Sequence, residues 1–217
     1  MQTFYYSPGS CSLAPHIVLE EVGATYERQL VKAGPGTQTP EWRAVNPKGR
    51  VPALSDVAGT IGGKPGLLTE AIAIMTYLAR LHPEAGLIPA EPMREARMYE
   101  WLSYLVAGIH ASLFASIRRT NRFVDDPELF APIQEKGRKS LHEAYAYVDG
   151  LLGDGRDWAV PGGYSLADIH LLVFYNFGYA VGFDMKVEFP HWRAHTEKLL
   201  ARPAVQRVVA IEELKLP

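Results

Sequence analysis

The feature that most constrains the fold is a change of sequence pattern near residue 85. Before it, short apolar runs alternate with turn-forming segments, and after it apolar residues recur at helical spacing almost to the C-terminus. This change predicts an α/β domain followed by an all-helical domain. We place the boundaries at residues 1–82 and 93–217, with the proline-rich segment 83–92 as a linker.

The first 82 residues predict a small mixed sheet with helices packed on it. A βαβ unit favours a parallel strand pair with a right-handed crossover, and a later ββα unit favours an antiparallel pair. The predicted elements are, in order, strand 2–6, helix 12–22, strand 26–32, a short helix near 39–42, a strand within 46–56, a hairpin turn at 62–66, and a helix over 70–81 capped by Thr69.

From residue 93 onward, every predicted element is a helix. The segment 169–180 is apolar nearly all round, so it is expected to be the buried centre of the helical domain. Ser165 and Asp168 form a capping box in front of it, with Asp in place of the usual Glu. The other predicted helices run over 93–119 and from 126 towards 152, and two short ones begin at Pro190 and Pro203.

Composition excludes several classes of protein. The formal net charge of -2 gives no electrostatic reason to expect nucleic acid or an anionic membrane as a partner. No apolar run reaches the roughly 18 residues of a membrane span, and the N-terminus does not resemble a signal peptide. The single cysteine excludes an intramolecular disulfide or a multi-cysteine zinc site. We expect a soluble, cytoplasmic protein with a free thiol.

That cysteine, Cys11, lies between a Pro-Gly turn and the start of a predicted helix. The positive end of a helix and its unpaired N–H groups favour a thiolate over a thiol. Packing as a small apolar residue is the alternative, and the local pattern leaves both open. Because no second cysteine is present, redox chemistry here would need a thiol from outside.

Two other segments have features of binding sites. Val51-Pro52 opens a predicted strand, where a cis bond would expose the Val51 backbone to an extended peptide; a trans proline in a surface turn is the alternative. Glu70 and Ala71 open a predicted helix, whose N–H groups suit a carboxylate while Glu70 suits an ammonium. An ordinary capped helix start is the alternative there.

Histidine and aromatic patterns add weaker candidates. His191 and His195 stand four residues apart, a possible metal pair, although surface histidines are the expected interpretation. Aromatic residues at helical spacing either line an apolar pocket or belong to the core, which is the commoner case: Trp101, Tyr104, Phe114, Tyr175 and Phe177.

Four segments together resemble the beta class of bacterial cytosolic glutathione transferases: YYSPGSCSLAPHIVLEEVG, NPKGRVPAL, LLTEAIAIMTYLA and YSLADIHL. They occur in the order and at the spacing of that family, over nearly the whole chain. The resemblance implies a thioredoxin-like N-terminal domain that binds glutathione and a helical C-terminal domain that forms an apolar site for the second substrate. It also implies that Ser165 and Asp168 are a folding element.

The resemblance assigns roles to particular residues. Cys11 is similar to a glutathione-contacting cysteine that can form a mixed disulfide. Val51 matches the residue whose backbone pairs with the cysteinyl part of glutathione, and Pro52 matches the family's cis proline. His110 matches a histidine that approaches this cysteine, but Ala111 stands where a basic residue often follows. The glutathione-binding residues implied are Cys11, Arg50, Val51, Pro52, Glu70, Ala71 and His110, of which Ala71 replaces a common serine.

Other classes of this superfamily hold the glutathione thiolate with a Tyr or Ser hydroxyl. Tyr5 and Ser12 are therefore predicted to assist, or to replace, Cys11. The predicted catalytic residues are Cys11, Ser12, His110 and Tyr5.

The predicted function is a glutathione transferase, active in detoxification, that conjugates the glutathione thiolate to small hydrophobic electrophiles. A glutathione-dependent thiol-disulfide oxidoreductase or peroxidase acting through Cys11, and a non-catalytic ligand- or protein-binding relative, are the alternatives. The resemblance also implies a homodimer. Glutathione is the expected co-substrate, with no metal, nucleic acid or membrane.

Overall fold

The computed structural model describes the chain except for residues 57–59, 62–63 and 217. The described residues form two compact units: Met1–Ile88 with Leu200–Pro217, and Pro89–Leu199. The C-terminal segment thus belongs to the first unit, whereas the sequence prediction assigned all of 93–217 to one helical domain. The predicted division by function stays a prediction. Part of the predicted turn at 62–66, Gly62-Gly63, lies outside the described residues.

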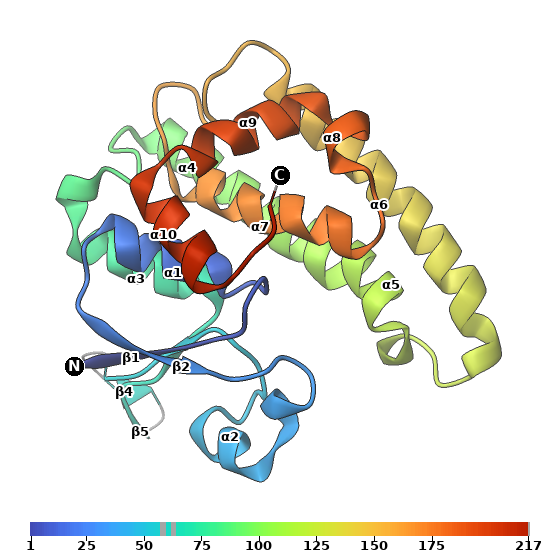
Figure 1. Ribbon diagram of the computed structural model, residues 1–217, viewed down its shortest axis with the longest axis horizontal. Coiled ribbons are helices and arrows are strands. Elements are labelled where there is room, and N and C mark those ends of the chain that lie inside the picture. Colours follow the sequence, from blue (N-terminus) through green and yellow to red (C-terminus); the bar gives the residue numbers. More distant parts are fainter. Residues whose placement is uncertain (57–59, 62–63, 217) are drawn as a thin grey trace. The chain divides into compact units, whose positions relative to one another are not determined.

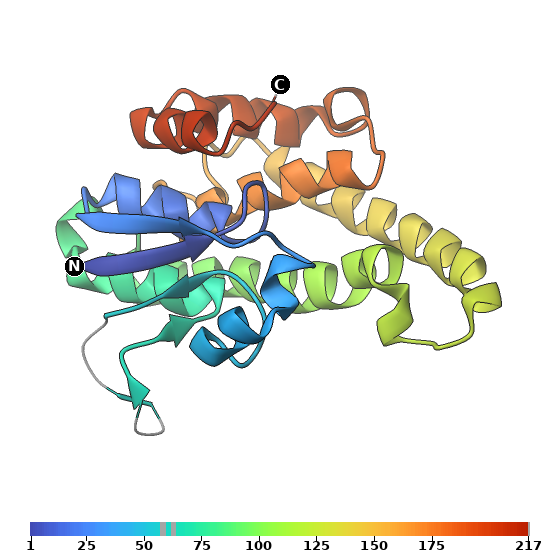
Figure 2. The ribbon, with the colours of Figure 1, turned by 60° about the horizontal axis from the view of Figure 1, so that its bottom comes forward.

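A mixed four-stranded sheet is the centre of the first unit (Figures 1 and 2). Its strands lie in the order β2-β1-β3-β6, with β1 parallel to β2, and β3 antiparallel to both β1 and β6. The predicted thioredoxin-like mixed sheet is therefore confirmed. The strands are β1 (Gln2–Tyr6), β2 (Tyr26–Leu30), β3 (Ala53–Leu54) and β6 (Leu68–Thr69); β4 (Thr60–Ile61) and β5 (Lys64–Pro65) pair separately.

Alternation along β1 places helices on both faces of this sheet, because successive strand side chains point to opposite faces. Phe4 and Tyr6 contact the ring of His16 on α1 (Leu13–Glu21), with ring centroids 5.3 and 5.2 Å apart. Tyr5 contacts Trp42 on α2 (Pro40–Val45), with centroids 5.0 Å apart. Helix α3 (Ala71–Leu81) packs beside α1.

The last helix, α10 (Pro203–Ile211), packs against α1 within the first unit (Figure 1). Glu212, just beyond α10, is buried with His16; one carboxylate oxygen lies 2.7 Å from His16 Nδ1. The other oxygen accepts the Gly9 N–H at 2.8 Å. Two ion pairs at the same contact join Arg202 to Glu21 and Arg207 to Glu20. The end of the chain therefore fixes the segment that precedes α1.

Helices make up the second unit, as predicted. Helix α7 is its most buried element, with twelve of its fifteen residues buried, which is the predicted position of the apolar segment. The elements are α4 (Pro92–Ser103), η3 (Tyr104–Phe114), α5 (Ala115–Arg118), η4 (Thr120–Arg122), η5 (Pro127–Leu129), α6 (Phe130–Leu152), α7 (Leu166–Ala180), α8 (Met185–Glu188) and α9 (Pro190–Leu200). In the described part of the chain, no helix has the length and apolar character needed to cross a bilayer.

The predicted helix over 93–119 differs from the structure in its centre, where η3 is wound as a π-helix. The Ala115 N–H donates to the carbonyl of His110, five residues back, instead of four. Hydrophobic spacing does not reveal this change, since a wider turn shifts the apolar face only gradually.

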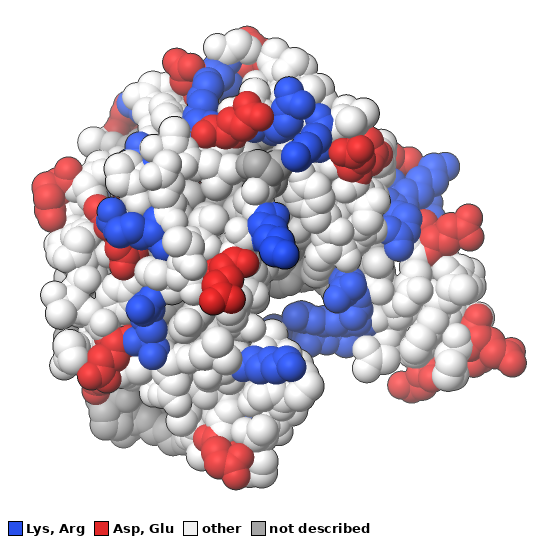
Figure 3. Space-filling model, viewed as in Figure 1, with Lys and Arg blue, Asp and Glu red and all other residues white. Residues whose placement is uncertain are grey.

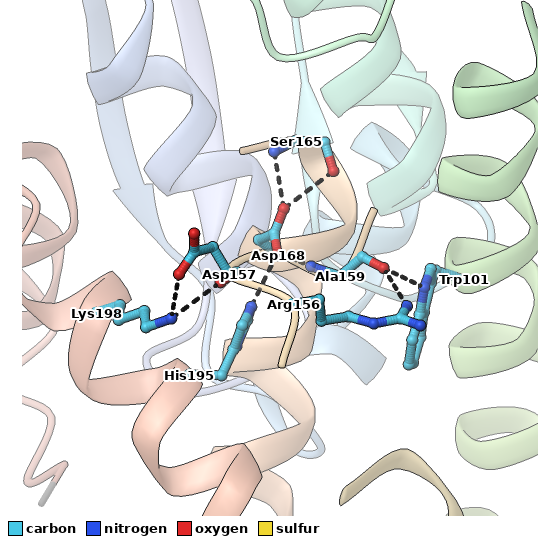
Figure 4. Close-up of polar contacts among 8 residues, drawn as sticks. All are labelled: Trp101, Arg156, Asp157, Ala159, Ser165, Asp168, His195 and Lys198. Carbon is cyan, nitrogen blue, oxygen red and sulfur yellow. Dashed lines mark hydrogen bonds and ion pairs between the residues drawn. The ribbon is translucent and has the colours of Figure 1, made fainter. Parts of the chain in front are cut away.

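The predicted capping box at the start of α7 is confirmed (Figure 4). One oxygen of the buried Asp168 accepts the Ser165 N–H and hydroxyl, at 2.8 and 3.0 Å. The other accepts the Ala159 N–H at 2.7 Å and lies 2.8 Å from His195 Nε2. The prediction of a surface position is wrong for His195, which is buried against this carboxylate.

Candidate functional site

Cys11 lies directly before the N-cap of α1, Ser12, and is half-buried. Its thiol donates to the carbonyl oxygen of Val51 at 3.4 Å. The peptide bond between Val51 and Pro52 is cis. The structure therefore brings together the cysteine and the Val51-Pro52 pair, which are 40 residues apart in the sequence.

The loop that carries Cys11 is held by serine side chains. The buried Ser12 hydroxyl donates to the Ser7 carbonyl at 3.0 Å and accepts the Ser7 N–H at 3.1 Å. Ser10 Oγ lies 2.9 Å from Ser12 Oγ. These contacts shape the loop from within, and the predicted catalytic role of Ser12 stays a prediction.

Val51 ends the segment that leads into β3, and its backbone is only partly used. Its carbonyl accepts the Cys11 thiol, whereas its N–H donates to no residue in the described part of the chain. The turn before it depends on Gly49, which has φ +61° and would bring a Cβ to 2.9 Å from the Thr37 carbonyl. Arg50 is exposed, and its carbonyl accepts the Asn46 side-chain N–H at 2.7 Å.

The start of α3 corrects one prediction. Its N-cap is Glu70 and not Thr69, and no side chain caps this helix end. Glu70 has φ +73° and ψ +125°, a conformation that costs a non-glycine residue about 1–3 kcal/mol. Sequence propensity disfavours glutamate there, so the pattern selected the neighbouring threonine. Ala71 then opens the helix with its N–H groups at the positive end of the dipole.

Lys48 is a residue at this site that the sequence analysis missed, although it lies within the NPKGRVPAL segment. Its ammonium donates to Glu70 Oε1 at 2.6 Å and to Thr69 Oγ1 at 2.9 Å. Glu212 was also missed, and no local pattern could have indicated it, since its partners His16 and Gly9 lie 196 and 203 residues away.

Two further predicted residues are Tyr5 and His110. Tyr5 and Leu67 pack against an apolar cluster of the first unit that contains Trp42 and Val51. His110 is in the second unit, on η3, where its ring lies 5.4 Å from that of Phe177. The predicted roles of both residues stay predictions.

The aromatic residues considered as pocket or core are mostly core. Trp101 is buried and its indole N–H donates to the Ala159 carbonyl at 3.1 Å (Figure 4). Phe114, Tyr175 and Phe177 are buried, and Tyr104 is half-buried. Among the described residues, no group of three or more His, Cys, Asp and Glu side chains is placed to hold a metal ion.

The first unit therefore carries three features on one mixed sheet: a thiol at a helix start, an open backbone edge before a cis proline, and an acidic residue at a second helix start. The binding roles of these residues stay predictions. The sheet and its helices define the thioredoxin-like class of protein. Models of the family confirm this class. "Glutathione S-transferase, N-terminal domain" matches residues 1–80, and "Glutathione S-transferase, C-terminal domain" matches residues 110–203.

Individual relatives are similar to this chain over nearly its whole length. "Glutathione S-transferase GstA" of Escherichia coli O157:H7 is 33% identical, covering 97% of this chain and 98% of the relative. "Disulfide-bond oxidoreductase YfcG" of Escherichia coli K12 is 26% identical, covering 99% and 97%.

Two solved structures extend the comparison. A glutathione transferase homologue from Sulfitobacter with bound glutathione has a TM-score of 0.87 at 29% identity, covering 99% of both chains. The beta-class glutathione S-transferase of Sphingomonas chungbukensis has a TM-score of 0.77 at 28% identity, covering 97% and 98%. The chain belongs to the glutathione S-transferase family, and the predicted enzyme class and co-substrate, glutathione, are thereby confirmed.

Proposed function

We propose that this protein conjugates the thiolate of glutathione to small hydrophobic electrophiles. The observation that carries the proposal is the contact between the Cys11 thiol and the Val51 carbonyl, with the Val51 N–H left open beside it. An extended cysteinyl residue that pairs with this backbone edge would bring its sulfur to the start of α1.

The γ-glutamyl end of glutathione fits the start of α3. The Glu70 carboxylate is exposed and suits the ammonium of the γ-glutamyl group, while the Ala71 N–H suits its carboxylate. The exposed Arg50 is a further candidate for the glycyl carboxylate.

Chemistry then takes place at the glutathione sulfur. The Cys11 thiol, which donates to the Val51 carbonyl, can donate instead to the glutathione thiolate and lower the free energy of that anion. The thiolate forms a carbon–sulfur bond with the electrophile, and the leaving group departs with the bonding electron pair. Binding both reactants in one site supplies the larger part of the acceleration.

A second candidate function is supported by the half-buried Cys11 thiol, which forms no disulfide, and by the relative named as a disulfide-bond oxidoreductase. The Cys11 thiolate would attack a glutathione-containing disulfide, form a mixed disulfide and expel the other thiolate. A second glutathione thiolate would attack the glutathione sulfur of that mixed disulfide. Oxidised glutathione would leave, and the Cys11 thiolate would be restored.

One set of measurements separates the two functions. Wild type and the Cys11→Ala variant are incubated with oxidised glutathione, and intact mass spectrometry measures whether one glutathionyl group is added. The conjugation and disulfide-reduction rates of the two proteins are then compared. Loss of disulfide reduction with conjugation retained would make Cys11 a redox residue, with another group holding the glutathione thiolate. No activity and no retention on immobilised glutathione would contradict both functions and favour a non-catalytic binding protein.

The predicted homodimer and cytoplasmic location are part of this proposal and stay predictions. Light scattering after size-exclusion chromatography measures the first, because a dimer has twice the 24.1 kDa mass of the chain.

A further inference from the structure

Lys48 and Glu70 form an ion pair that stability does not explain. The lysine and glutamate side chains are 55% and 61% exposed, and ion pairs with such exposure contribute only about 0–1 kcal/mol. The backbone strain at Glu70 costs about as much or more. Strain of this kind persists where a residue is held for function.

The loop that carries Lys48 is built to hold it. The side-chain oxygen of the buried Asn46 accepts the Lys48 N–H at 3.1 Å, and the Asn46 carbonyl accepts the Gly49 N–H at 2.9 Å. Gln38 also donates to the Gly49 carbonyl at 3.1 Å. These contacts fix the backbone of Lys48, and Thr69 and Glu70 position its ammonium, so less freedom is lost when the ammonium binds a ligand.

The pair keeps unused hydrogen-bonding capacity. An ammonium has three N–H donors, and Lys48 uses two of them, on Glu70 Oε1 and Thr69 Oγ1. Glu70 Oε2 accepts from no residue in the described part of the chain. One donor and one carboxylate oxygen therefore remain for a ligand that carries both charges.

An α-amino acid group is such a ligand, because its ammonium and carboxylate are attached to the same carbon. Ala71 offers the carboxylate an N–H but no hydroxyl, which leaves room for a further donor. We propose that Lys48 binds the α-carboxylate of the γ-glutamyl end of glutathione while Glu70 binds its ammonium. This inference rests on the proposed glutathione site and adds a binding residue to it.

The test combines two protein variants with two ligands. Dissociation constants are measured by calorimetry for glutathione and for γ-aminobutyryl-cysteinyl-glycine, which lacks only the α-carboxylate. Lys48→Met is expected to weaken glutathione binding by about five- to twentyfold, as for a partly exposed charge-assisted hydrogen bond. The same variant is expected to bind the analogue as wild type does. In conjugation assays KM for glutathione rises and kcat is kept.

Lys198→Met is the matched control, since Lys198 is a comparably exposed lysine that lies 2.9 Å from Asp157, in the second unit. It should bind both ligands as wild type does, and Lys48→Arg should restore part of the lost affinity. Unchanged or tighter glutathione binding by Lys48→Met would overturn the inference, and so would an equal loss for both ligands. Failure of wild type to bind glutathione would instead overturn the proposed function.

Discussion

At the scale of single residues, Glu70 departs from two rules of local structure. Glycine is the usual residue at φ +73°, and Ser, Thr, Asp and Asn are the usual N-caps. Glu70 satisfies neither rule, because its side chain caps no helical N–H and its backbone is strained. Its carboxylate is instead directed to Lys48 at the surface.

This strain predicts a trade-off between stability and binding. Glu70→Gly and Glu70→Ala both remove the carboxylate, but only glycine relieves the backbone. We expect the glycine variant to be more stable than the alanine variant by about 1–2 kcal/mol in urea unfolding. Both should lose at least about tenfold in glutathione affinity. Equal stability of the two variants would show that φ at residue 70 is not strained.

Local sequence patterns explain which residues of the candidate site could be predicted, and long-range contacts explain which could not. Cys11, Val51 and Ala71 lie at the turn, the proline and the helix start that mark them locally in the sequence, and their binding roles stay predictions. The Lys48–Glu70 pair depends on a contact across 22 residues, and no periodicity encodes it. The same limit applies, more strongly, to Glu212.

At the scale of elements, α7 was predictable because its capping box and its all-round apolar character are both local patterns. The environment of His170, which lies on this helix, could not be predicted from such local patterns. The imidazole is buried, and neither ring nitrogen has a hydrogen-bond partner in the described part of the chain. Burial, with a smaller effect of His110, lowers the pKa of His170 to about 3.

His170 therefore predicts a pH dependence of stability. Between pH 6.5 and pH 3 the unfolded chain carries a proton on this residue that the folded chain lacks, so the free energy of unfolding falls as the pH falls. From pH 7 to pH 5 this loss is about 2 kcal/mol.

Urea unfolding of His170→Leu at both pH values tests this prediction. The variant should lose about 2 kcal/mol less than wild type over this interval. His191→Leu, at an exposed histidine, is the control and should keep the wild-type dependence. An identical dependence in wild type and His170→Leu would mean that His170 is protonated in the folded protein.

At the scale of the whole molecule, the chain leaves the first unit near residue 88 and returns to it at residue 200. Basic and acidic side chains are interspersed on the face drawn in Figure 3, in agreement with the formal net charge of -2. The returning segment is held by ion pairs to partly buried carboxylates, Arg202 to Glu21 and Arg207 to Glu20, and by the buried contacts between α10 and α1. The carboxylate of Glu212 is the polar centre of these contacts, since it binds both His16 and Gly9.

We predict that removing this carboxylate lowers the stability of the end of the chain and of the loop that carries Cys11. Glu212→Ala removes the carboxylate that binds the buried His16 Nδ1 and accepts the Gly9 N–H, at an expected cost of about 3–5 kcal/mol in urea unfolding. Glu213→Ala, at an exposed neighbour, should cost much less. Hydrogen exchange should accelerate in the segment from Gly9 into α1, while α7, in the second unit, keeps its protection. If instead α7 exchanges faster and the Gly9 segment does not, the end of the chain stabilises the helical unit and not the glutathione site.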